Sequence, residues 1–215
     1  MLISMKAVLF DLDGTLTNTI DDIADSMNHA LRLYALPEHP VDDYKYMVGD
    51  GARKLAERAV AGRPEFFQNV YDAYMKQYAT HNAVKTRAYG GTTELLENLI
   101  ARNIRICVLS NKPHSDTVTV VRHYFPTIEF DAVQGQVEGV PIKPDPQGAL
   151  ILSEKLGIKP SDFAYLGDTS VDMRCALNAG MHPFGALWGF RSAEELLQSG
   201  AEALLKEPLD LLKYL

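Results

Sequence analysis

The chain has 215 residues, of which 47% are hydrophobic and 23% charged, and its 21 basic and 28 acidic side chains give a net charge of −7. These fractions are typical of a globular protein and exclude a wholly disordered, collagen-like or coiled-coil chain. The acidic balance disfavours a nucleic-acid backbone or an anionic membrane as the main partner, but a few well-placed cations could still hold a small anion.

The first predicted element is a strand at residues 6–10, KAVLF, whose apolar side chains indicate burial on both faces of a sheet. The following stretch, to about Thr86, has helix signals and no convincing strand. Apolar spacing predicts three helices there, at residues 20–34, 52–60 and 64–81, with Thr19 as the N-cap of the first. The third carries an aromatic stripe that favours a helix-bundle core, formed by Phe66, Phe67, Tyr71, Tyr74 and Tyr78.

The rest of the chain alternates strands with helices. Strands are predicted at residues 104–109, 130–133, 163–166 and 184–187, and helices at 92–102, 116–124, 146–156 and 171–179. Such alternation predicts an α/β fold with a doubly wound, Rossmann-like parallel sheet. The helical block is then an inserted α-helical cap at residues 17–87, and residues 1–16 and 88–215 form the core. The two connections between them are expected to lie side by side as a hinge.

Cys107 and Cys175 lie among apolar neighbours, at a spacing that suits neither a zinc site nor a disulfide framework, so both are expected to be buried. The sequence has no run of the roughly 18 apolar residues that a membrane span requires, and no signal-peptide core fits the N-terminus. We therefore expect a cytoplasmic protein without a membrane partner.

Two carboxylates directly follow the first strand, in the sequence Asp11-Leu12-Asp13-Gly14-Thr15. Residues two apart on an extended chain project to the same side, so both can face one site. Gly14 permits the tight turn that follows. Such a pair suits an oxygen-preferring cation such as Mg²⁺. It also suits a division of labour between a nucleophile and a proton carrier.

Three further signals lie downstream. Ser110-Asn111-Lys112 follows the strand at 104–109, and its hydroxyl and backbone N–H groups can hold a phosphate oxygen. Lys143 lies in a loop whose flanking prolines restrict where its ammonium can go. The segment GDTSVD follows the strand at 163–166, and its carboxylates, four apart, lie on one side if the turn enters a helix: Asp168 and Asp172. Segments that follow parallel strands meet at the carboxyl edge of a sheet, where open α/β sheets bind ligands.

Together these segments resemble the four ordered motifs of the haloacid dehalogenase-like hydrolases, and the helical insertion resembles the cap of that family. The resemblance implies a Mg²⁺-dependent phosphatase acting through an aspartyl-phosphate, with Asp11 as nucleophile and Asp13 as general acid and base. It implies that Mg²⁺ is held by Asp11, the backbone carbonyl of Asp13 and Asp168, with Asp172 as a ligand or support. The residues implied to hold the phosphoryl group are Gly14, Ser110, Asn111 and Lys143.

The resemblance also indicates that the partner is a small phosphorylated metabolite, with 2-phosphoglycolate as the leading candidate. The expected oligomeric state is a monomer or a homodimer. In the cap, Gly49 and Gly51 can shape a loop that approaches the substrate closely. The planar fork of Arg53 suits a substrate carboxylate. Three alternatives remain: phosphoryl transfer to a sugar, as in a β-phosphoglucomutase; hydrolysis of pyrophosphate or a sugar phosphate; and a non-catalytic phosphate-binding module. The sequence lacks the glycine-rich loops of dinucleotide and P-loop binding, which counts against the last.

Overall fold

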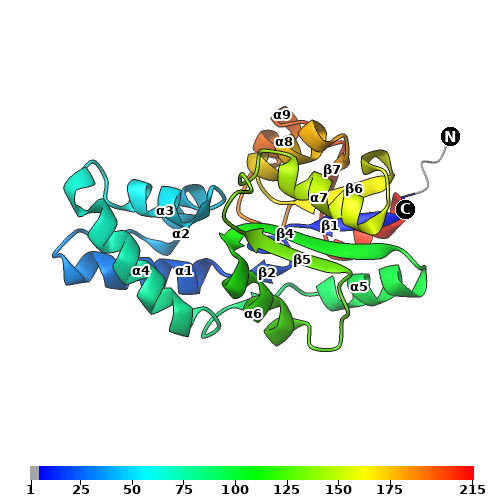
Figure 1. Cartoon of the computed structure of the whole chain (residues 1–215). Coiled ribbons are helices and arrows are strands. Elements are labelled where there is room, and N and C mark those ends of the chain that lie inside the picture. Colours follow the sequence, from blue (N-terminus) through cyan, green and yellow to red (C-terminus); the bar gives the residue numbers. More distant parts are fainter. Residues whose placement is uncertain (1–4) are drawn as a thin grey trace.

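A six-stranded parallel sheet forms the core of the computed structural model, which describes residues 5–215 (Figure 1). The strands lie in the order β5-β4-β1-β6-β7-β8. Their bounds are Ala7–Phe10 for β1, Arg105–Pro113 for β4, Ala132–Gln136 for β5, Phe163–Gly167 for β6, His182–Ala186 for β7 and Ala203–Leu205 for β8. From β1 the chain extends the sheet first on one side and then on the other. This arrangement confirms the predicted doubly wound α/β fold.

Successive residues of β1 enter different hydrophobic cores because neighbouring side chains of a strand point to opposite faces. Val8 and Phe10 pack on the face covered by α5 (Thr92–Ala101) and α6 (His114–Tyr124). Ala7 and Leu9 pack on the other face, which is covered by α7 (Gln147–Leu156) and α8 (Ser170–Ala179). All four side chains are fully buried. A carboxylate can therefore be accommodated only where the strand ends, and this explains the position of the first acidic motif.

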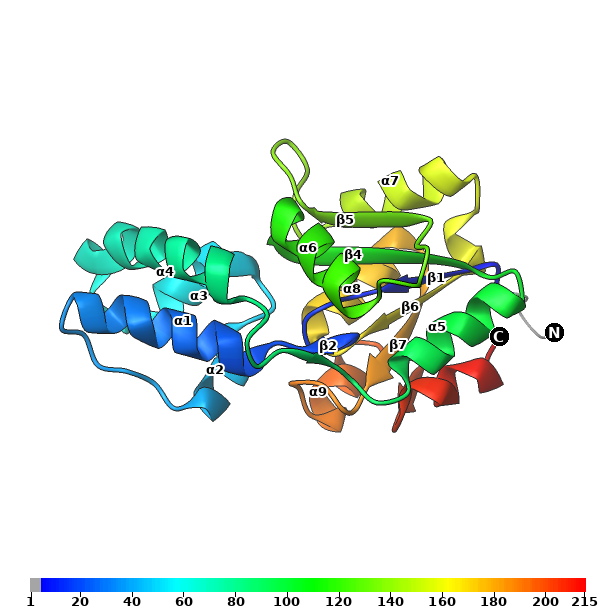
Figure 2. The same ribbon diagram turned by 90° about the horizontal axis from the view of Figure 1, so that it is seen from below.

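The cap has its own apolar cluster and lies beside one end of the sheet (Figure 2). Its helices are α1 (Ile20–Leu33), α2 (Val41–Met47), α3 (Gly51–Ala59) and α4 (Phe67–His81), with a short 3₁₀ turn at Pro64–Phe66. Tyr74 and Tyr78 of the aromatic stripe belong to this cluster. One core side chain, Phe190, also packs in it.

Some elements differ from the sequence-based predictions. Helix α1 begins directly after Thr19, but the Thr19 hydroxyl does not cap it, because the residue lacks the extended backbone of a capping position and its oxygen is buried without a partner. Strand β5 runs to Gln136 rather than ending at Val133, since its polar second half lies at the edge of the sheet. Other elements that were not predicted are short, and they include α2, α9 (Ala193–Gln198), β8 and 3₁₀ turns at Pro160–Asp162 and Pro208–Lys213.

The two connections between cap and core lie side by side as a two-stranded antiparallel ribbon, β2 (Thr17–Asn18) and β3 (Arg87–Ala88). The predicted cap boundaries, 17 and 87, fall within this ribbon. Beside it, the buried Asp22 carboxylate of α1 accepts hydrogen bonds from the backbone N–H groups of residues 84–86, at 2.8–3.0 Å, and from the Thr86 hydroxyl at 2.7 Å. One side chain thus fixes the returning chain against the first cap helix.

We expect Asp22→Ala to lower the free energy of unfolding by about 3 kcal/mol, because it leaves several buried N–H groups without an acceptor. For a chain of this size the loss corresponds to a decrease in Tm of about 6–12 °C, measured by thermal denaturation. The control is Asp21→Ala, which removes the same charge from the same helical turn and should cost less than about 1 kcal/mol. Equal losses in the two variants would contradict this role of Asp22.

Candidate active site

Three acidic side chains from separate segments meet at the carboxyl edge of the sheet. Asp11 follows β1, Asp168 follows β6, and Asp172 lies in the first turn of α8. All three are buried, and one carboxylate oxygen from each lies within 4.8 Å of the others. Hard oxygen ligands at this spacing could hold a divalent cation.

The buried ammonium of Lys143 lies among these acids. Its Nζ donates hydrogen bonds to Asp11 Oδ1 and to Asp172 Oδ1, both at 2.7 Å, and to the carbonyl of Leu109 at 3.2 Å. The structure therefore brings together four of the predicted site residues, which come from three separate regions of the chain.

Negative charge is in excess at this cluster, since three carboxylates face one ammonium. Burial, followed by the charge of Asp172, raises the pKa of Asp11 to about 7, although Lys143 opposes the shift. Burial and the charges of Asp11 and Asp172 raise the pKa of Asp168 well above its usual range. Burial alone would lower the pKa of Lys143, but the two carboxylates outweigh it and raise that pKa. A bound divalent cation would relieve this repulsion.

Glycines allow the backbone to approach Asp168 closely. A Cβ placed on Gly14, whose φ is +92°, would lie 2.2 Å from an Asp168 carboxylate oxygen, and one placed on Gly189 would lie 2.2 Å from Asp168 Cβ. The carboxylate also accepts hydrogen bonds from the backbone N–H of Phe190 at 2.8 Å and from the Thr15 hydroxyl at 3.1 Å. Gly14 thus contributes close packing as well as the predicted turn.

The second carboxylate of the first motif, Asp13, makes a different contact. Both of its oxygens lie 2.9 Å from the Nζ of Lys112, which also donates to the Tyr78 hydroxyl of α4 at 2.8 Å. Neither Lys112 nor Tyr78 was a sequence-based site candidate. Lys112 could have been found from its place beside Ser110 and Asn111, whereas nothing in the aromatic stripe distinguishes Tyr78 from the core aromatics.

The side chain of Asn111 connects β4 with the cap and with the loop that carries Lys143. Its Nδ2 donates to the carbonyls of Gly49, in the cap, and Lys143, at 2.9 and 3.1 Å, and its Oδ1 accepts from the backbone N–H of Lys143 at 2.8 Å. Ser110 is buried beside it, and its hydroxyl oxygen accepts from the backbone N–H of Lys112 at 3.2 Å. The phosphate-binding candidates therefore lie next to the acids.

A cavity lies between the cap and this edge of the sheet. The core contributes the polar part of its lining, with Asp11, Asp13, Ser110, Asn111, Lys112 and Lys143. The cap contributes a mostly apolar part, which includes Val48, Gly49, Gly51, Leu55, Tyr74 and Tyr78. The predicted glycine loop of the cap thus lies at the cavity, together with the end of the aromatic stripe.

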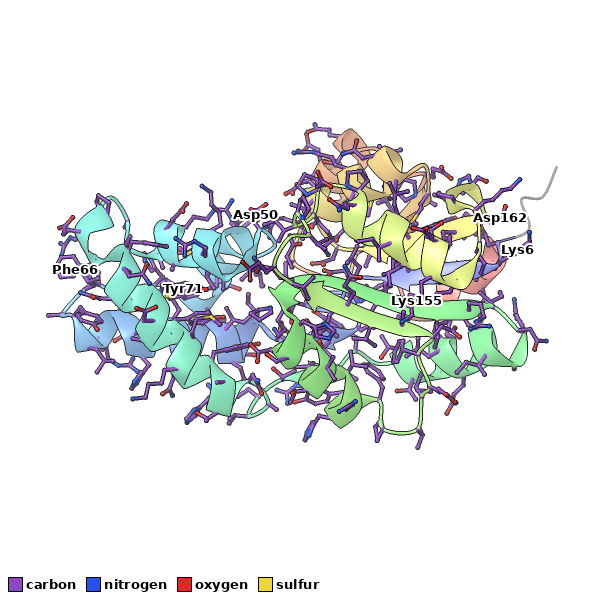
Figure 3. All side chains as sticks on the ribbon, in the orientation of Figure 1. Lys6, Asp50, Phe66, Tyr71, Lys155 and Asp162 are labelled. Carbon is purple, nitrogen blue, oxygen red and sulfur yellow. The ribbon has the colours of Figure 1, made fainter. Side chains whose placement is uncertain are left out.

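The structure does not place Arg53 at this cavity. Its side chain is exposed, and its guanidinium carbon lies over the rings of Phe67 and Tyr71, 5.0 and 5.3 Å from their centroids. Figure 3 shows Tyr71 in the cap, away from Asp50 at the boundary between cap and core. The reason is helical periodicity: Leu55, Ala56 and Ala59 form the buried face of α3, and Arg53 projects to one side of it. The expected contact with a substrate carboxylate is therefore not supported by this geometry.

The chain belongs to the haloacid dehalogenase-like hydrolases, because the model of that family matches residues 8–186. It is similar to the phosphoglycolate phosphatase of Nitrosospira multiformis, with 30% identity over 207 residues that cover 94% of this chain and 91% of that one. The phosphoglycolate phosphatase of Aquifex aeolicus is 28% identical, over 98% and 97% of the two chains.

The structure shows the same likeness. A crystal structure from Lactobacillus delbrueckii subsp. bulgaricus, provisionally described as a phosphoglycolate phosphatase, has a TM-score of 0.92 at 27% identity and covers 97% of each chain. None of the helices within residues 5–215 combines the length and hydrophobicity that crossing a bilayer requires.

The cluster could hold a divalent cation, and we expect Gly189→Ala to weaken such binding by about 10–100-fold, measured by calorimetry, because the new methyl group displaces Asp168. The backbone of Gly189 is not in the left-handed region, so any effect comes from this contact rather than from backbone strain. The control is Gly90→Ala, since a Cβ there has no neighbour within 4 Å. An unchanged affinity for the divalent cation in Gly189→Ala would contradict a cation site that includes Asp168.

Proposed function

We propose that this protein is a Mg²⁺-dependent cytoplasmic phosphatase that hydrolyses a small phosphorylated metabolite, with 2-phosphoglycolate as the leading substrate. The observation that carries the proposal is the buried cluster of Asp11, Lys143, Asp168 and Asp172 at the carboxyl edge of the sheet. The similarity to proteins named phosphoglycolate phosphatase supports the choice of substrate.

The acidic cluster fits Mg²⁺, an ion that prefers carboxylate and carbonyl oxygens. Asp11, Asp168 and the backbone carbonyl of Asp13 would hold it, with Asp172 as a further ligand or as a support. When bound, Mg²⁺ neutralises charge on the phosphoryl oxygens and so stabilises the transition state. The excess of buried carboxylates over ammonium groups, and the raised pKa of Asp11 and Asp168, support a cation there.

In this proposal the chain performs two displacements at phosphorus. An Asp11 carboxylate oxygen bonds to phosphorus while the ester bond breaks, and Asp13 donates a proton to the leaving oxygen. Water then attacks the aspartyl-phosphate, Asp13 takes its proton, and Asp11 is released with inorganic phosphate. Lys143 fixes one oxygen of Asp11 through its 2.7 Å hydrogen bond and so orients the other.

Lys143 and Ser110 would also hold the transferring phosphoryl group, together with the backbone N–H of Asn111. The backbone N–H of Gly14, which the sequence also suggested, donates instead to the carbonyl of Thr17 at 2.8 Å. The phosphoryl-binding groups surround the end of β1 and are fixed by the fold before the substrate arrives, which is the condition for strong electrostatic stabilisation. The apolar cap wall would exclude water from the cavity and so strengthen these interactions.

The direct test is phosphate release by the purified protein from p-nitrophenyl phosphate and from a panel of metabolites that includes 2-phosphoglycolate, pyrophosphate and hexose phosphates. We expect activity that disappears with EDTA, returns with Mg²⁺ and is lost in Asp11→Asn, with 2-phosphoglycolate giving the highest kcat/KM. Conversion of β-glucose 1-phosphate to glucose 6-phosphate in place of phosphate release would show a mutase instead. Binding of phosphate esters without turnover would contradict an enzymatic function.

The variant Asp13→Asn tests the role of Asp13 as general acid separately from the role of Asp11 as nucleophile. We expect its kcat for 2-phosphoglycolate to fall by about 10²–10⁴-fold, because an alkoxide is a poor leaving group without a proton donor. p-Nitrophenolate leaves readily without a proton, so phosphorylation of Asp11 by p-nitrophenyl phosphate should slow far less, measured as the pre-steady-state burst. Equal losses for both leaving groups would exclude Asp13 as the general acid.

A further inference from the structure

Lys112 occupies an unusual position for a lysine, since its side chain is only 4% exposed. Its Nζ contacts both Asp13 oxygens and the Tyr78 hydroxyl, and lies 4.8 Å from the centre of the Tyr78 ring. An ammonium has three N–H donors, which these partners can engage. Lys112 thus connects the end of strand β4, the first motif and the cap helix α4 at one point.

The cavity has few cations with which to bind an anion. Among the described residues of its lining, the basic side chains are Lys112 and Lys143. Lys143 is paired with Asp11 and Asp172 at the end where the phosphoryl group would bind. A second anionic group on the substrate would therefore meet Lys112, because Arg53 lies outside the cavity.

We propose that Lys112 is a specificity-determining residue, which binds a carboxylate carried by the same carbon as the ester oxygen of the substrate. This inference rests on the proposed function, in which Asp13 serves the leaving oxygen. Before the substrate binds, the Asp13 carboxylate occupies the position that the substrate carboxylate takes later. Substrate binding is then an exchange of one carboxylate for another on the same ammonium.

The exchange follows from geometry and burial. To deliver a proton, the Asp13 carboxyl group must face the leaving oxygen, and in doing so it gives up contacts with Lys112. Asp116 also lines the cavity and is attracted by Lys112, but the side chains that pair with the ammonium are Asp13 and Tyr78. A buried ammonium without a paired counter-ion is strongly unfavourable, so a second anion is needed at that moment. In a phosphoglycolate-like molecule the ester oxygen and the carboxylate carbon are bonded to one carbon. The ammonium, 2.9 Å from the Asp13 oxygens, is therefore within reach of that carboxylate.

A matched substrate pair isolates this contact. Ethyl phosphate has the heavy-atom chain of 2-phosphoglycolate with a methyl group in place of the carboxylate. We expect the wild-type protein to favour 2-phosphoglycolate by at least about 100-fold in kcat/KM, and Lys112→Met to lose most of that preference. Lys112→Arg, which keeps the charge, should retain part of it. If a Lys112 variant also disturbs the position of Asp13, kcat/KM falls for both esters, and this effect cancels in the ratio of the two kcat/KM values.

The control variant is Lys76→Met, which removes an exposed ammonium from α4, the helix that carries Tyr78. It should leave the substrate ratio unchanged. If Lys112→Met fails to fold, Lys112→Gln, which keeps a hydrogen-bond donor without the charge, carries the same expectation. Calorimetry supplies a measurement without turnover: 2-phosphoglycolate should bind Asp11→Asn much more tightly than the double variant with Lys112→Met.

Three outcomes would overturn the inference and leave the proposed phosphatase intact. The first is an unchanged ratio in Lys112→Met with hydrolysis of ethyl phosphate preserved. The second is loss of the preference in Arg53→Met instead, which would restore the contact expected from the sequence. The third is a Lys112-dependent preference for pyrophosphate over 2-phosphoglycolate, which would assign the position to a second phosphate. An absence of Mg²⁺-dependent hydrolysis of every ester would contradict the proposed function itself.

Discussion

The ammonium of Lys143, held between Asp11 and Asp172 at the end of the sheet, is the interaction on which the site depends. Both ion pairs are buried, so each partner would be strongly destabilising without the others. The arrangement is possible only because three segments reach the same edge of a parallel sheet: the end of β1, the loop after β5 and the start of α8. The fold places these three side chains together, and their charges determine what the site can bind.

The core of the site could be predicted because burial and chemistry constrain the same residues. A strand that is apolar on both faces leaves Asp11 as the first position where a carboxylate can occur, and parallel strands bring their following segments to one edge. The haloacid dehalogenase-like motifs then identify the acids individually. The family could therefore be identified from the small number of positions in these motifs.

The cap could be predicted as a helical block but not in its contacts. Periodicity identifies the buried face of a helix without saying which neighbour covers it, so Tyr78 resembled the other core aromatics and Arg53 appeared free to meet a substrate. In the structure, Arg53 lies over two aromatic rings of its own cap, while Lys112 reaches the cavity from the core. The side-chain cap predicted at Thr19 is not formed, and the full extent of β5 was not predicted, because both depend on tertiary neighbours rather than on local sequence.

Phe190 contacts both the core and the cap. Its backbone N–H binds the Asp168 carboxylate, while its ring, 6% exposed, packs in the apolar cluster of the cap. Swinging the cap away would hydrate an aromatic surface, at a cost of about 1.5–3 kcal/mol. From this contact alone the open form would be a minority species, on the order of one molecule in ten to one in a hundred. Release of the products would then require this less populated open form. Because Phe190 also binds Asp168, opening of the cap would be coupled to the acidic cluster.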